Sequence, residues 1–219
     1  MSPRSRRRTD TRPRSRRAFR GPLIVGLILI LGLVLAGCGS STFDPTGACK
    51  GDGSAPGAYP ELEAAIPKLY KDAKPINLDS GRTCTPTGLG TLASHGVKEL
   101  RFAGGTWSTG TDSGLSLAVF TSPDGSALDP AWITEFFETS AKAGKNVTSI
   151  ETTDYPISTA AAPIGRRIDV LNGESFQSIV VWAKDGKVAA ALVGNFIREI
   201  QTKEAHEAVV QAAVDAYRS

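Results

Sequence analysis

The residues best suited to chemistry in this sequence are three cysteines and two histidines: Cys38, Cys49, Cys84, His95 and His206. Cys38 has the most informative surroundings. It follows a segment with nine arginines among the first twenty residues and then an uncharged apolar run over 22–37. A basic region, an apolar region and small residues in that order form a secretory signal. The sequence therefore predicts that the chain is exported and that residues 1–37 are its signal peptide.

The apolar run is close in length to the roughly 17–25 residues of a membrane-spanning helix, so its length leaves a permanent span open. The tetrapeptide that ends it favours cleavage, because Leu35-Ala36-Gly37-Cys38 after such a leader resembles the lipobox of bacterial lipoproteins. The resemblance implies that the Cys38 thiol receives a diacylglyceryl group with palmitate-like chains and becomes the first residue of the mature protein. Two or more acyl chains hold a protein stably on a bilayer. The expected location is the extracytoplasmic face of the cell membrane.

Two export routes remain open for this leader. The segment Ser15-Arg16-Arg17-Ala18-Phe19-Arg20 resembles the twin-arginine motif, and that route carries folded cargo. The leucine-rich apolar run, in contrast, suits the general secretion route.

The other two cysteines, Cys49 and Cys84, form an even pair in a chain that is expected to be exported. Such a pair predicts one disulfide, because exported proteins reside in oxidising compartments. The alternative is a two-cysteine metal site, which would need histidines nearby. His95 and His206 lie far apart in the sequence, so no metal ligand set and no cofactor is expected.

The charge of the chain changes sign when the leader is removed. The whole sequence has a net charge of +3, but the leader holds nine basic residues and one acidic residue, which leaves 16 basic and 21 acidic residues in 38–219. A mature part with a net charge of −5 lacks the basic surface that nucleic acids attract. The expected partners are the membrane, through the lipid, and an envelope protein or small ligand.

The sequence contains no motif typical of a catalytic nucleophile, a zinc protease or a phosphate-binding loop. We expect His206 on the solvated side of the last helix, beside Glu204 and Glu207. The apolar side of that helix is predicted to consist of Ala205, Val209, Ala212 and Ala216. His95 lies just before a strand and is a candidate for a binding or catalytic site. Trp107 is a second candidate binding residue, because it follows Gly104-Gly105-Thr106 in a polar segment where an exposed aromatic would mark a contact site. The alternative is that Trp107 packs over the sheet edge.

Arg166 is a third candidate binding residue. Arg166 and Arg167 open a strand, so their side chains face opposite ways. We expect one of them to pair with an acidic residue at the surface.

Residues 39–58 are rich in Gly, Ser, Pro and Thr, which predicts a flexible tether after lipidated Cys38, with its distal part pinned to the domain through Cys49. One domain over 59–219 follows. Helices are predicted at 60–70, from Asp129 to Gly144, and at 203–217. Residues 75–91 are rich in Pro, Gly and Asn and are predicted to form a loop. Strands are predicted at 97–103, 115–121 and 147–152, and the dipeptides Asn172-Gly173 and Asp185-Gly186 predict a meander over 167–193.

These elements predict the α+β class, with an antiparallel sheet of about five or six strands, helices packed on one face, a C-terminal three-stranded meander and a closing helix. The layout over 97–217 resembles PsbP-like exported domains. That resemblance implies an adaptor or assembly role and brings no catalytic residues with it. The expected function is thus a non-catalytic, lipid-anchored binding or adaptor module. The alternatives are an envelope enzyme with a site of scattered residues, including His95, and a mainly structural envelope protein.

Overall fold

The computed structural model of the chain describes residues 43–159 and 162–217. The predicted signal peptide and the predicted lipidation site, Cys38, lie outside the described residues. Among the helices of the described part, none is long and apolar enough to cross a membrane.

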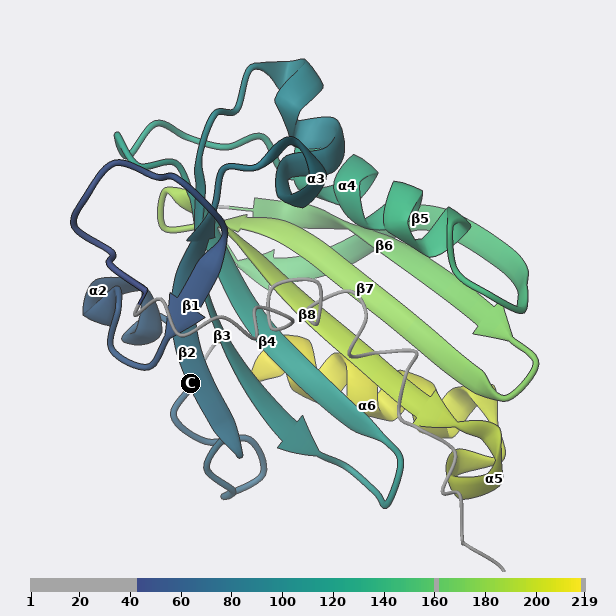
Figure 1. The fold of residues 1–219 in the computed structure, drawn as a ribbon. Coiled ribbons are helices and arrows are strands. Elements are labelled where there is room, and N and C mark those ends of the chain that lie inside the picture. Colours follow the sequence, from purple (N-terminus) through teal and green to yellow (C-terminus); the bar gives the residue numbers. More distant parts are fainter. Residues whose placement is uncertain (1–42, 160–161, 218–219) are drawn as a thin grey trace, which may run out of the picture.

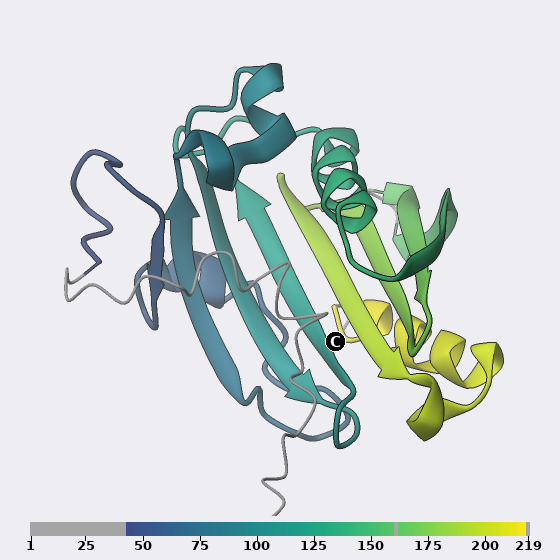
Figure 2. The ribbon, with the colours of Figure 1, turned by 45° about the vertical axis from the view of Figure 1, so that its right-hand side comes forward.

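Eight strands form a single sheet in the order β1-β2-β3-β4-β8-β7-β6-β5, and every neighbouring pair is antiparallel (Figure 1). The sheet is strongly twisted from β1 to β5, as Figure 2 shows, which is the usual consequence of right-handed strand twist. The strands are β1 (Gly53–Ala55), β2 (Asn77–Thr83), β3 (Leu100–Ser108), β4 (Gly114–Thr121), β5 (Val147–Thr159), β6 (Ala162–Asn172), β7 (Ser175–Lys184) and β8 (Lys187–Phe196).

The predicted fold class is therefore wrong. The molecule has a mostly-sheet fold, with 41% of the described residues in strands and 26% in helices, in place of five or six strands with helices packed on one face. The two unpredicted strands are β1 and β2. In β2 the buried positions are filled by Ser80, Gly81, Arg82 and Thr83. Because these residues are small or polar, no apolar alternation in the sequence reveals this strand.

The helices lie on both faces of the sheet. Helix α4 (Pro130–Lys142), α3 (Pro86–Leu89) and the 3-10 helix η1 (Gly90–His95) pack on one face, and α2 (Pro60–Glu63) and α6 (Lys203–Asp215) pack on the other. In Figure 1, α6 is seen behind the sheet. Each face has its own apolar core, and a short helix, α5 (Ile197–Ile200), connects β8 to α6.

The structure confirms the predicted start of α4 and one of the two predicted turns. The Asp129 side chain accepts a hydrogen bond from the N–H of Ala131 at 2.8 Å and caps α4. Asp185 and Gly186 both have positive φ, at 49° and 72°, and join β7 to β8. The β6–β7 turn is shifted by one residue, because Asn172 pairs with Ser175 in the ladder. The Asn172 side chain then accepts hydrogen bonds from the backbone N–H groups of Glu174 and Ser175.

Candidate functional site

The first described residues are held against β2 by a buried arginine. Arg82 is 5% exposed, and its guanidinium donates hydrogen bonds to the backbone oxygens of Gly47 at 2.6 Å, Asp44 at 2.9 Å and Ala48 at 3.4 Å. The guanidinium also lies 5.9 Å from the centroid of the Phe43 ring. Three carbonyl groups bound to one buried cation fix the path of this segment, since charge-assisted hydrogen bonds are among the stronger ones in proteins.

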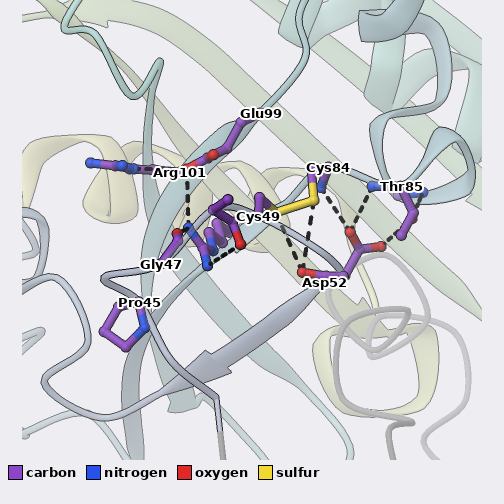
Figure 3. The surroundings of a disulfide bond; sticks show 12 residues. Pro45, Gly47, Cys49, Asp52, Cys84, Thr85, Glu99 and Arg101 are labelled. Atoms are coloured by element: carbon purple, nitrogen blue, oxygen red, sulfur yellow. Dashed lines mark hydrogen bonds and ion pairs between the residues drawn. A yellow bond between two sulfur atoms is a disulfide. The ribbon is translucent and has the colours of Figure 1, made fainter.

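A disulfide between Cys49 and Cys84 closes the same segment onto the end of β2, as predicted, and the two Cα atoms are 6.2 Å apart. Figure 3 shows Asp52 beside it. The Asp52 carboxylate accepts hydrogen bonds from the N–H groups of Cys84 at 2.8 Å and Thr85 at 3.0 Å, and from the Thr85 hydroxyl. Burial raises the pKa of the Asp52 carboxyl, but the hydrogen bonds from Thr85 and its neighbours outweigh burial, and the net pKa is lowered. Asp52 is thus held as a carboxylate that stabilises the turn after β2.

These contacts correct the predicted flexible tether over 39–58. Residues 53–55 form β1 and pair with β2, and the segment before them is bound by Arg82 and the disulfide. The part of the tether that falls within the described residues, 43–58, is therefore folded against the sheet. Only residues 39–42 separate Phe43 from Cys38. Covalent geometry limits the distance from Cys38 to Phe43 to about 18 Å.

Removal of the disulfide is expected to destabilise the mature chain measurably. Replacing Cys49 and Cys84 by serine opens a loop of 35 residues, for which the chain-entropy model gives roughly 3–4 kcal/mol of lost free energy of unfolding. Urea denaturation of both proteins measures this difference, and trypsin should cleave faster after Lys50 in the variant. An unchanged denaturation midpoint would show that the disulfide is not a stabilising element.

His95, a predicted site residue, lies at the end of η1. Its ring stacks on Trp132 of α4, with the centroids 4.9 Å apart and the planes at 9°. Its Nε2 atom is 2.7 Å from Oε2 of Glu135. The neighbouring hydroxyl of Ser94 donates to the backbone oxygen of Thr91. His95 therefore contacts an acid and an aromatic ring of α4, and these contacts join η1 to α4.

Trp107, the second predicted site residue, is buried at 2% exposure. Its indole Nε1 donates a hydrogen bond to the backbone oxygen of Ala73 at 2.9 Å. The expectation of an exposed indole at the surface is thus wrong, because the side chain fills the core between β3 and the segment before β2. The packing alternative describes its position correctly.

Arg166, the third predicted site residue, is exposed and forms an ion pair with Asp154, its cross-strand partner on β5. Arg167 faces the opposite side of the sheet and is buried. The two adjacent arginines thus point in opposite directions, as strand geometry requires, and the one at the surface has an acidic partner.

A buried polar network around His206 was missed by the sequence prediction. It includes side chains of β6, β7, β8 and α6. His206 is 2% exposed; its Nε2 atom is 2.9 Å from Oγ of Ser178, and its Nδ1 atom is 2.8 Å from Oδ1 of Asn195. Arg167 donates hydrogen bonds to Asp169 at 2.9 Å, to Ser178 at 3.2 Å and to Glu207. The predicted solvated position of His206 is wrong.

The contact between Ser178 and His206 has the atom types of a serine nucleophile and its base. However, Ser178 is 0% exposed, and its hydroxyl donates to Asp169. Burial, followed by the charge of Arg167, lowers the pKa of His206 to about 4, so the imidazole is neutral near pH 7. A substrate has no access to this hydroxyl, and the arrangement acts to fix α6 to the sheet.

One signal in the sequence could have revealed this network. The buried residues of α6 are His206, Val210, Ala213 and Val214, which follow helical spacing. The predicted apolar side used Ala205, Val209, Ala212 and Ala216, so it was rotated by one residue. The side of the helix with the larger apolar residues, Val210 and Val214, is the buried one, and His206 lies on that side.

No family model matches this chain, and no curated protein matches it. Within the described ranges, no group of three or more His, Cys, Asp or Glu side chains could hold a metal ion. The N-terminal segment is attached to β2 by the hydrogen bonds of Arg82 and by the Cys49–Cys84 disulfide.

Proposed function

We propose that this chain is a bacterial lipoprotein, anchored by a lipid on Cys38 to the extracytoplasmic face of the cell membrane. The observation that carries the proposal is Leu35-Ala36-Gly37-Cys38 at the end of a basic and then apolar leader. The Cys49–Cys84 disulfide supports it, because structural disulfides persist in oxidising compartments outside the cytoplasm.

The anchored domain is proposed to act as a binding or adaptor module for an envelope protein or a small ligand. Support comes from the contacts of the residues with catalytic potential. The His95 ring stacks on Trp132 of α4, and Ser178 and His206 are enclosed in the core. The resemblance of the layout to PsbP-like domains, which mostly act as adaptors, favours the same role.

The anchor is tested by partition of the natural chain expressed with its leader. After an alkaline carbonate wash, the protein should stay with the membranes and then enter the detergent phase of a cloud-point extraction, since acyl chains contribute about 0.8 kcal/mol per buried methylene. Recovery of the protein in the aqueous phase would contradict the proposal. Trypsin added to intact spheroplasts should digest the domain, and full protection would contradict an extracytoplasmic location.

A further inference from the structure

Residues 67–76, between α2 and β2, form a loop that combines exposed apolar and basic side chains. We call it the lysine loop. Leu69 is 46% exposed and Ile76 is 74% exposed, and they are two of the three large hydrophobic side chains exposed in the described part of the chain. Lys68, Lys71 and Lys74 are exposed beside them. Figure 1 shows this segment as a loop beyond the lower end of β2.

The loop is held in one conformation by the core beneath it. Tyr70 and Ala73 exchange two backbone hydrogen bonds, at 2.9 and 3.0 Å, and the buried Trp107 donates its own hydrogen bond to Ala73. The turn between them places Lys71 and Asp72 at φ of 47° and 64°. Residues other than glycine are uncommon in this region and cost of order 1 kcal/mol each. The tip therefore presents two charged side chains in a backbone conformation that glycine would adopt more easily.

The charge of the lysine loop is opposite to that of the rest of the mature chain. The loop holds three lysines against one aspartate, a net charge of +2, within a mature part of 16 basic and 21 acidic residues. Lysines flanked by exposed aliphatic side chains suit an anionic bilayer surface. The ammonium groups lie at the level of the phosphates while the aliphatic groups enter the interface.

The position of the loop fits a membrane contact. Phe43 lies against Gly53 of β1 and close to Arg82 of β2, and at most about 18 Å of chain joins it to Cys38. The lysine loop leads into Asn77 at the other end of β2, about 17 Å from Arg82 at strand spacing. The lipid anchor and the lysine loop would then meet the bilayer at opposite ends of the β1–β2 edge of the sheet.

We propose that the lysine loop docks on the anionic phospholipid headgroups of the membrane that holds the lipid anchor, and so orients the domain with its β1–β2 edge toward the bilayer. This inference rests on the proposed lipid anchor at Cys38. Trp107 then acts as a positioning residue, because it fixes the loop without touching the membrane.

Flotation with lipid vesicles tests the proposal. The chain 38–219 with Cys38→Ser is mixed with vesicles of phosphatidylglycerol and phosphatidylcholine, or of phosphatidylcholine alone. We expect tighter binding to the anionic vesicles. Substituting Lys68, Lys71 and Lys74 together by glutamine should lower the partition coefficient by roughly a hundredfold, since each lysine contributes about fivefold.

The matched control replaces three other exposed lysines, Lys98, Lys142 and Lys145, by glutamine, and should bind as the parent chain does. Leu69→Ser with Ile76→Ser should weaken binding to both kinds of vesicle. Equal binding by the lysine-loop variant and its control, or no preference for phosphatidylglycerol, would overturn the proposal. Because this chain lacks Cys38, the result is independent of lipidation, whose failure would be seen only in the partition of the natural chain.

Discussion

A precursor with Cys38→Ala is expected to keep its signal peptide and to incorporate no lipid. In the lipoprotein family that the leader resembles, the thiol is the acceptor of the diacylglyceryl group, and cleavage before the cysteine follows. Without the thiol at position 38, neither step can take place. The effect should be complete, because no other cysteine follows the apolar run directly. Labelled palmitate added to growing cells, followed by gel electrophoresis, measures the lipid and the length of the chain together.

The control for this variant is the Cys49→Ser, Cys84→Ser chain. It removes the disulfide but leaves the leader and Cys38 intact, so it should take up the label like the natural chain. Undiminished labelling of the Cys38→Ala precursor would mean that the lipid, if any, is attached elsewhere.

Arg167→Ala is expected to lower the free energy of unfolding by about 3 kcal/mol. The guanidinium is the only cation in the hydrogen-bonded network that joins β6, β7 and α6 among the described residues. Removing one partner of a buried ion pair costs roughly 3–5 kcal/mol. The lower end applies here, because the side chains of Asp169 and Glu207 are 27% and 43% exposed and can be partly rehydrated. The 5.4 Å contact of Arg167 with the Tyr155 ring is lost as well.

Arg166→Ala provides a matched control on the adjacent residue. Its ion pair with Asp154 is exposed on both sides, and such pairs contribute between about 0 and 1 kcal/mol. Urea denaturation of both variants at neutral pH gives the comparison. Equal losses for the two arginines would show that the network around Ser178 and His206 does not stabilise the sheet.

The sequence predicted the elements whose local signals agree with their tertiary environment. Asp129 and Pro130 mark the start of α4, and Asp185-Gly186 marks the β7–β8 turn. The pairing of Cys49 with Cys84 follows from the count of cysteines in an exported chain. In each case the necessary physical information lies within a few residues or in composition alone.

The missed features depend on contacts between distant segments. β2 was predicted as a loop because its side chains are mostly polar, and it becomes a buried strand through pairing with β3 and through the hydrogen bonds of Arg82 to residues 44–48. The three-residue β1 exists only because β2 offers it a free edge. With both strands missed, the sheet was predicted too small, and residues 43–58 were assigned to a tether attached to the domain only through Cys49.

The positions of the predicted site residues also depend on contacts with distant segments. Trp107 was considered for the surface because glycines and polar residues surround it in the sequence, yet the Gly105 position is where the indole packs. His206 was expected in solvent because glutamates flank it, yet its two ring nitrogens lie within hydrogen-bond distance of Ser178 and Asn195. Burial of polar side chains is favourable only when distant partners are present, and a single sequence does not reveal those partners.

The measurement that tests the account most directly is the mass of the N-terminal tryptic peptide of the protein isolated from its native membranes. After reduction and alkylation, trypsin should release a peptide over residues 38–50, because Lys50 is the first basic residue after Cys38. This peptide is expected to begin at Cys38 and to have the added mass of a diacylglyceryl group, with alkylation at Cys49 alone. A peptide that runs from Gly21 to Lys50, or one that begins at Cys38 with an alkylated thiol and no lipid, would contradict it.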